Sequence, residues 1–221
     1  MQTYNINFHG DSTLVVNFGK GIDENINNIV HFYINIFEKN IIQNKYVLDI
    51  YLTYNSVVID YDFNLMESFK LKNIIEKIIL ENRIESKKNN NFEKIIEIPV
   101  NYGEEFGPDL SKISKSIGLS EKEIITIHSS KNYRVHMLGF MPGFPYLGGM
   151  DEKISFPRLS EPRISIPAGS VGIAGNQTGV YPFSSPGGWN IIGRTNIKLF
   201  DINKSPPNFL ESGTYLRFVA N

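Results

Sequence analysis

One stretch of the chain is almost empty of ionisable side chains. From Ile164 to Gly193 there is no Asp, Glu, Lys, Arg or His, and Tyr181 is the only ionisable residue. Turn-forming residues gather in the same region: eleven of the eighteen glycines lie between 139 and 193, and seven of the eleven prolines between 142 and 186. Because glycine and proline interrupt long helices and favour turns, this stretch predicts short strands joined by tight turns.

Short runs rich in β-branched and aromatic residues continue this pattern to the end of the chain. From Tyr133 onward they read YRVHMLGF, RISIP, VGIAG, GVYPF, NIIGRTNIKLF and TYLRFVAN. Many short strands separated by turns are typical of an all-β barrel or sandwich. Upstream, KIIEIPVNY predicts a strand and GPDLSKISKSIG a short helix that ends at Gly118. A second helix is predicted to begin at a capping box formed by Ser120 and Glu123.

The first part of the chain has a different pattern, in which strands alternate with helices. YNINFHG and STLVVNFG predict one pair of strands, and KYVLDIYLTYNSVVIDY predicts another. Apolar residues at helical spacing follow each pair. Those of the first helix are Ile22, Ile26, Ile29, Val30, Tyr33 and Phe37, and those expected to point inward from the second are Phe69, Ile74, Ile75, Ile78 and Ile79.

The order ββαββα indicates a small α+β layer, with helices against one antiparallel sheet. The polar, Asn-rich segment ESKKNNNFE (85–93) is predicted as a linker. We therefore expect an α+β domain over residues 1–88, followed by a mainly β domain over 89–221.

The overall composition excludes several classes of partner. A formal net charge of −1 creates no long-range field for nucleic acid or an anionic membrane, and no apolar run approaches the ~20 residues of a membrane span. The chain has no cysteine, so disulfides and thiolate metal sites are excluded, and no basic, apolar leader begins it. We expect a cytoplasmic protein with no nucleic-acid partner, no membrane contact and no metal site.

The charge-free stretch is suited to binding rather than to acid–base catalysis. Its hydroxyl and amide groups, such as Ser170 and Gln177, can bind a ligand or stabilise an oxyanion. Arg163 and Arg194 bracket the stretch, and a guanidinium suits a carboxylate or a phosphate, although a structural salt bridge explains either arginine equally. His136 is a candidate proton carrier or a packed structural histidine.

Two proline–glycine turns are followed by large aromatic residues. Met141-Pro142-Gly143-Phe144 fits a type II turn, with glycine at the position that needs a positive φ, and Ser185-Pro186-Gly187-Gly188 fits the same template. Phe144, Tyr146 and Trp189 follow these turns. Aromatic side chains on rigid turns lose little entropy on binding, which suits a pocket wall or an interface anchor. The alternative is that the rings fold back into the barrel core.

No nucleotide-binding motif is complete in this chain. GSVGIAG (169–175) departs from G-x-G-x-x-G and opens no predicted helix, and FGKG (18–21) lacks the upstream glycine of a P-loop. The sequence therefore predicts no ATP cradle of its own, and it contains no G-x-S-x-G nucleophile motif.

The block LGFMPGFPYLGGMDEKISFPRLSEPRISIPAGSVGIAGNQTGVYPFSSPGGWNIIGRT (138–195) closely resembles the family of 5-oxoprolinase B subunits. That family is also known as allophanate hydrolase subunit 1, the carboxyltransferase-domain subunit or the KipI-type sporulation-kinase inhibitor. The resemblance continues upstream through IPVNYGEEFGPDLSKISKSIGLSEKEIITIH (98–128) and, more loosely, into the first half. It implies an α+β domain followed by a cyclophilin-like β-barrel.

The resemblance also implies a function that this chain performs only with partners. We expect the B subunit of an ATP-dependent 5-oxoprolinase, which converts 5-oxo-L-proline to L-glutamate together with a KipA-like C-type subunit and an A-type subunit. ATP would bind to the complex, no biotin is expected, and the chain alone would be inactive. Candidate catalytic residues are Arg163, Arg194 and His136, and the expected substrate-binding residues are Gly143, Phe144, Tyr146, Ser170, Gln177 and Trp189.

Other functions are compatible with the same resemblance. The chain could instead inhibit a sporulation-type sensor histidine kinase by gripping it with the barrel. A weaker alternative is a carboxyltransferase-type component of an enzyme similar to urea carboxylase. Prolyl isomerase activity is suggested by the cyclophilin-like fold alone, and a fold by itself does not establish a function.

Overall fold

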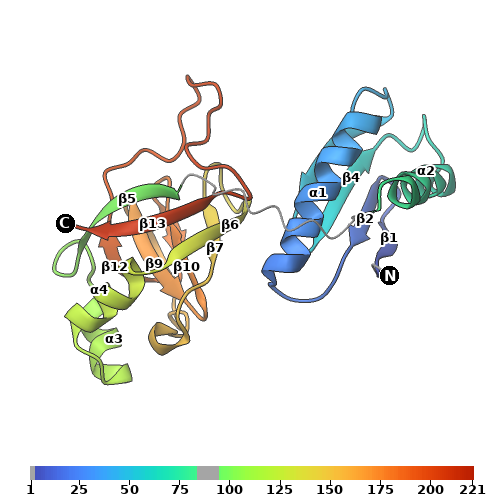
Figure 1. Ribbon diagram of the computed structural model, residues 1–221. Helices are drawn as coiled ribbons and strands as arrows, with labels where there is room; N and C mark the ends of the chain where they lie inside the picture. Colours follow the sequence, from blue (N-terminus) through green and yellow to red (C-terminus); the bar gives the residue numbers. More distant parts are fainter. Residues whose placement is uncertain (1–2, 84–94) are drawn as a thin grey trace. The chain divides into compact units, whose positions relative to one another are not determined.

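The computed structural model describes residues 3–83 and 95–221, and the chain divides into two compact units, Met1–Asn91 and Phe92–Asn221 (Figure 1). The predicted linker at 85–93 and the predicted domain boundary between residues 88 and 89 lie outside the described residues. Each unit has its own buried apolar core.

The first unit is a four-stranded antiparallel sheet with two helices. Its elements are β1 (Asn5–His9), β2 (Thr13–Asn17), α1 (Glu24–Ile41), β3 (Val47–Leu52), β4 (Ser56–Tyr61) and α2 (Ser68–Glu81). The strand order in the sheet is β1-β2-β4-β3. The predicted ββαββα order and the α+β class are therefore confirmed.

The helices of the first unit bury one face each. The Asp23 side chain accepts a hydrogen bond from the backbone N–H of Ile26 (3.0 Å) and so caps the start of α1. In α2 the buried apolar residues are Leu71, Ile75, Ile78 and Ile79. The predicted inward position of Phe69 is wrong, because its side chain is 72% exposed. Phe69 lies two residues before Leu71, which is roughly 200° around a helix and therefore on the opposite face.

The second unit is built around a closed barrel of seven strands. Its elements are β5 (Ile95–Tyr102), α3 (Leu110–Ile117), α4 (Glu121–Ser129), β6 (Asn132–Leu138), β7 (Pro145–Gly148), the short 3₁₀ helix η1 (Glu152–Ile154), β8 (Arg163–Ile166), β9 (Ser170–Ala174), β10 (Gln177–Val180), β11 (Ser185–Gly187), β12 (Asn190–Arg194) and β13 (Tyr215–Ala220). The barrel order is β10-β7-β6-β13-β5-β12-β9, and β8 pairs with β11 in a separate two-stranded sheet.

Closure of the barrel depends on one parallel pair. β13 runs parallel to β5 over the whole of its length, from Tyr215 opposite Ile95 to Ala220 opposite Val100. Closure leaves none of the barrel strands with a free edge, which protects such short strands from pairing with other chains. The predicted barrel is confirmed, as are the end of α3 at Gly118 (φ +75°) and the capping box of Ser120 and Glu123.

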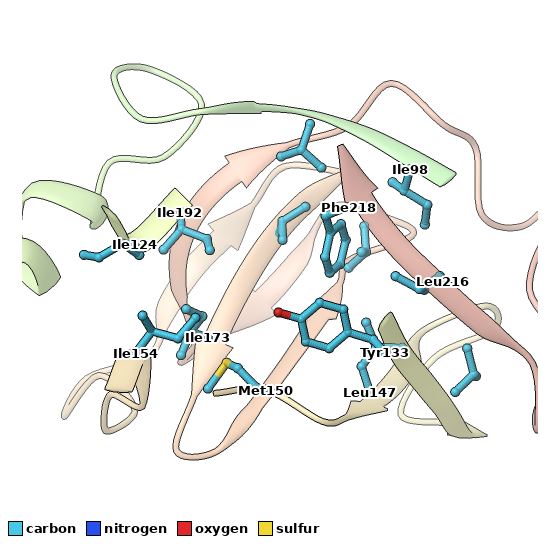
Figure 2. Close-up of a cluster of buried hydrophobic side chains, with 14 of the residues drawn as sticks. Ile98, Ile124, Tyr133, Leu147, Met150, Ile154, Ile173, Ile192, Leu216 and Phe218 are labelled. Atoms are coloured by element: carbon cyan, nitrogen blue, oxygen red, sulfur yellow. The ribbon is translucent and has the colours of Figure 1, made fainter. Parts of the chain in front are cut away.

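Alternate residues of the barrel strands fill its interior. Ile98, Ile173 and Phe218 point inward from three different strands, and the Tyr133 ring faces that of Phe218 with centroids 5.3 Å apart (Figure 2). Ile124 of α4 belongs to the same cluster. Inward apolar residues at every second position are what a two-residue strand period produces.

A buried polar network also lies inside this core. His128, at the end of α4, is fully buried, and its ring stacks on Phe218 at 4.6 Å. The Thr178 hydroxyl donates to the Gly172 carbonyl (3.0 Å), so its oxygen accepts from His128 Nε2 (2.9 Å). His128 Nδ1 then accepts from the Tyr102 hydroxyl (2.7 Å). Burial lowers the pKa of His128 to about 3, so the imidazole is neutral in the folded chain.

The neutral state of His128 makes the stability of the barrel depend on pH. Between about pH 6.5 and 3 the unfolded chain binds a proton at His128 that the folded chain does not bind. The free energy of unfolding should therefore fall with falling pH, by about 1.4 kcal/mol per unit from this residue. His128→Gln removes this pH-dependent contribution to the free energy of unfolding, because glutamine does not titrate. The difference in that free energy between wild type and variant should therefore narrow by about 2 kcal/mol from pH 6.5 to 5.

Urea unfolding followed by the fluorescence of Trp189, the single tryptophan, measures this difference in the barrel unit. Titrations of all other groups are common to both proteins and cancel. Parallel pH profiles for the two proteins would contradict the assignment of a neutral, buried His128.

Candidate functional site

The aromatic residues that follow the two proline–glycine segments form a small, mostly buried cluster. The Phe144 ring makes edge contacts with Tyr181 (5.3 Å between centroids), Trp189 (5.5 Å) and Tyr146 (5.1 Å). Phe144, Tyr181 and Trp189 are nearly inaccessible to solvent. The sequence left open whether these rings are displayed for binding or packed into a core. Phe144 and Trp189 are packed into a core, and only Tyr146 is half-buried.

This cluster lies outside the barrel and is seated on glycines. Val171 and Ile173 of β9 point into the barrel core, so Gly172, which alternates with them, faces outward. A Cβ atom on Gly179 would lie 3.0 Å from Trp189 and 3.1 Å from Phe144. The high glycine content of this stretch therefore has a packing cause, because the rings need bare backbone beneath them.

Arg163 is held by a carboxylate that the sequence did not single out. The Arg163 Nη2 atom lies 2.6 Å from Asp109 Oδ1, and Asp109 Oδ2 accepts a hydrogen bond from the backbone N–H of Ile191 (2.6 Å). The Asp109 side chain is 6% exposed. Arg163 Nη1 donates to the Trp189 carbonyl (3.4 Å). Arg163 thus forms a structural salt bridge, which is one of the two roles that the sequence left open for it.

Arg194, unlike Arg163, lies against an aromatic ring and has no carboxylate partner among the described residues. Its guanidinium carbon lies 5.6 Å from the centroid of the Phe106 ring, and within residues 3–83 and 95–221 it forms no ion pair. Its partner across the β9–β12 ladder is Ser170. The Ser170 hydroxyl and Arg194 Nε are both buried and have no hydrogen-bond partner among the described residues. Of the two predicted arginines, Arg194 is therefore the one whose charge is available to an anion.

His136 and Gln177 lie on barrel strands. His136 lies in β6 at a register shift between Val135 and Met137, and its buried ring packs against Gly148 so closely that a Cβ there has no room. Gln177 is half-buried and opposite Ala174. His136, Arg163 and Arg194 thus lie on three different strands, β6, β8 and β12.

The first proline–glycine turn is confirmed and the second is wrong. Gly143 has φ +82°, and the Phe144 N–H donates to the Met141 carbonyl (3.1 Å), as a type II turn requires. At the second position, Ser185–Gly187 form β11, which pairs with β8, and Gly187 has no positive φ. Pairing holds this segment extended, with Gly187 so close to Tyr181 that a Cβ would lie 2.5 Å from the phenol oxygen.

The confirmed turn borders a cavity of about 350 Å³. Its lining residues are Leu138, Gly139, Phe140, Met141, Pro142, Gly143, Phe200 and Asn208. Gly143 is the one predicted substrate-binding residue among them. No sequence signal pointed to Phe200 or Asn208, because they lie 57 and 65 residues after Gly143, and the fold alone brings them here.

The described residues contain no group of three or more His, Cys, Asp or Glu side chains that could hold a metal ion. None of the helices in the described ranges is long and apolar enough to cross a membrane. Two features of the described barrel residues could contact a ligand: the Arg194–Ser170 pair, which is polar, and the mainly apolar pocket beside Gly143.

An α+β unit joined to a closed barrel is the architecture of a carboxyltransferase-type domain. Residues 4–210 match the family described as carboxyltransferase domain, subdomain C and D. The chain is 42% identical to the B subunit of 5-oxoprolinase from Bacillus subtilis (strain 168), over 98% of this chain and 92% of that protein. The chain therefore belongs to the family of 5-oxoprolinase B subunits.

Solved structures agree with this assignment. The crystallised protein TTHA0988 is 30% identical with a TM-score of 0.81, and the similarity covers 95% of this chain and 39% of that one. The urea carboxylase of Kluyveromyces lactis is 20% identical with a TM-score of 0.78, over 99% of this chain and 22% of that one, which shows the fold alone. In both proteins this fold is one part of a much longer chain.

The Asp109 bridge yields a prediction about stability. Asp109→Asn removes the negative charge and leaves the Arg163 guanidinium without its counter-ion, while Ile191 keeps an acceptor. Because Arg163 is about one-third exposed, the loss should be smaller than for a fully buried pair, roughly 2 kcal/mol in the free energy of unfolding.

Urea unfolding followed by Trp189 fluorescence measures this loss. Glu97→Gln, which breaks the exposed Arg217–Glu97 pair on the same barrel, is the matched control and should change stability by no more than about 0.5 kcal/mol. Equal effects of the two substitutions would show that Asp109 has no special structural role.

Proposed function

We propose that this chain is the B subunit of an ATP-dependent 5-oxoprolinase and helps to convert 5-oxo-L-proline to L-glutamate in a site completed by C-type and A-type partner subunits. The observation that carries the proposal is the 42% identity to the B subunit of 5-oxoprolinase from Bacillus subtilis over nearly the whole of both chains. The chemistry of the barrel surface supports a contribution through binding.

The groups that this chain offers support a function that is completed by partners. His128 is neutral and hydrogen-bonded within the barrel, and His136 is buried beside Gly148, so neither imidazole is presented at the barrel surface. Residues 170–174 of GSVGIAG form β9 instead of a loop before a helix, so this segment is no nucleotide cradle. ATP, which would activate the lactam carbonyl when bound, is therefore assigned to a surface provided mainly by a partner.

Arg194 is the residue that this chain would contribute to substrate binding. The Phe106 ring supports its guanidinium on one side, and no carboxylate of the described chain neutralises it. 5-Oxoproline has a carboxylate and the activated intermediate would have a phosphate, and both suit the planar guanidinium fork. In this proposal Ser170 lies next to Arg194 and lines the same end of β9 and β12.

The alternative function is inhibition of a sensor histidine kinase. No described feature of the barrel surface specifically favours it. A pull-down with kinase dimerisation domains separates the two functions. Likewise, the similarity to urea carboxylase concerns the fold, and no biotin-dependent step is assigned to this chain.

The proposal predicts an activity that appears only in the assembled complex. The purified chain alone should show no 5-oxoproline-dependent ATP hydrolysis, and the chain mixed with its C-type and A-type partners should form glutamate and ADP together. A coupled ADP assay with glutamate detection measures both. ATP turnover on 5-oxoproline by this chain alone would overturn the shared site, and an inactive complete mixture would overturn the assigned substrate.

Arg194→Ala tests the anchoring residue in the same reconstituted complex. Loss of charge-assisted hydrogen bonds to the substrate should lower kcat/KM for 5-oxoproline by roughly 10- to 100-fold. Arg217→Ala, which removes an arginine paired with Glu97 on the barrel surface, is the matched control and should leave kcat/KM unchanged. If the two variants are equally active, Arg194 is not the anion anchor.

A further inference from the structure

One edge of the sheet in the first unit is open. β1 forms this edge, and among the strands of the described chain it pairs with β2 alone (Figure 1). Within residues 3–83 and 95–221 the backbone of β1 makes no hydrogen bond to a partner other than β2. Every second residue of an edge strand directs its N–H and C=O groups away from the sheet, and such a row is a template for pairing with another strand.

The opposite edge of the sheet is protected against such pairing, whereas β1 is not. β3 has a register shift between Val47 and Asp49, and the Asp49 carboxylate accepts a hydrogen bond from the Ile50 N–H (2.8 Å). A bulge and a charged residue are two of the devices that keep edge strands from pairing. β1 reads NINFH, contains no Asp, Glu, Lys, Arg or Pro, and pairs with β2 without a register shift. The β1 edge is therefore suited to accept a further strand.

The sequence of β1 is complementary to itself when two copies run antiparallel. Ile6 and Phe8 face the helices and pack against the core. The alternate residues are exposed on the other face of the sheet, and they are Asn5, Asn7 and His9. A two-fold axis at Asn7 would place Ile6 opposite Phe8 of a second copy, and the two outer polar residues opposite each other. This register pairs all five residues of the strand, apolar with apolar and polar with polar.

The exposed ring of Phe69, in the first turn of α2, adds an apolar contact beside this edge. Its centroid lies 5.7 Å from that of the Phe8 ring, and Phe69 is 72% exposed. Since Ile6 of a second copy would lie opposite Phe8, it would also lie beside the Phe69 ring and cover part of it. Apolar area buried in this way on both copies favours their association.

The charges of the neighbouring helix do not oppose a second copy. Lys70 is paired with Glu67 (3.0 Å), and Lys72 is paired with Glu76 (3.8 Å). Two identical surfaces repel each other when each has unpaired charges of one sign, because every such charge then meets its own kind. Here the cations of α2 near Phe69 have their counter-ions on the same helix, and β1 itself contributes no acidic or basic residue of the Asp, Glu, Lys or Arg type.

We propose that two copies of this chain associate through β1, with the two β1 strands antiparallel about a two-fold axis at Asn7, so that the two four-stranded sheets become one continuous sheet. A sheet of that size is within the usual range for open sheets. A two-fold interface uses the same surface on each copy, so a single contact covers both open edges. This association does not depend on the proposed function, because no residue of the barrel takes part in it.

Charged substitutions of Asn7 test this register directly. Asn7 is exposed, so Asn7→Lys and Asn7→Asp should each keep the melting temperature of the wild type. In the proposed dimer each variant has two like charges opposite each other, and the dimer dissociation constant from sedimentation equilibrium should rise roughly tenfold or more. An equimolar mixture of the two variants brings opposite charges together and should restore dimerisation. Leu48→Lys, at a 65% exposed position of the other edge strand, is the matched control and should dimerise as wild type does.

Each other result overturns self-association through β1. A wild-type chain that stays monomeric at every concentration would contradict the association itself. Dimers that persist in both Asn7 variants would place the interface elsewhere. Variants that fail to dimerise separately and do not recover on mixing would exclude the two-fold axis at Asn7. A monomeric wild type that binds a C-type or A-type subunit, with the binding lost in Asn7→Lys, would assign the β1 edge to that subunit.

Discussion

The carboxylate of Asp109 connects three parts of the barrel unit that are far apart in the sequence. It lies just before α3, accepts the Ile191 N–H at the start of β12, and binds Arg163 at the start of β8. The backbone N–H of Asp109 also donates to the Ile191 carbonyl (3.0 Å). Both oxygens of this nearly buried carboxylate have a partner. The three segments are therefore held in one arrangement relative to one another.

The outer aromatic cluster depends on that arrangement. Phe144, Tyr181 and Trp189 fill the space between the barrel wall and the sheet of β8 and β11, and glycines beneath them leave room for the rings. A charge in this layer would be buried without a partner, which explains why the buried positions between Ile164 and Gly193 have none. Exposed positions of the stretch, such as Ile164, are uncharged as well, and packing does not account for those.

The features that remain for binding lie at separate places on the barrel. Arg194 and Ser170 offer a cation and a hydroxyl at the end of β9 and β12, and Phe140 borders an uncharged cavity beside Gly143. Neither place contains an acid–base pair. The proposed function uses the first of these places as an anion anchor in a site whose reactive groups would come from other subunits, and the chain belongs to the family of 5-oxoprolinase B subunits.

The sequence by itself determined the local structure: the ββαββα order, the barrel strands, the capping box at Ser120 and the type II turn at Gly143 all follow from residue spacing and from the conformational freedom of glycine. It could not distinguish a displayed ring from a packed one, because Phe144 and Trp189 have the same local signals in both cases. The tertiary structure decided that, and it also decided the contacts of the two arginines, since Asp109 reaches Arg163 across 54 residues and Arg194 forms no ion pair in the described chain. Contacts between distant segments have no local signature, and they arise only when the barrel closes.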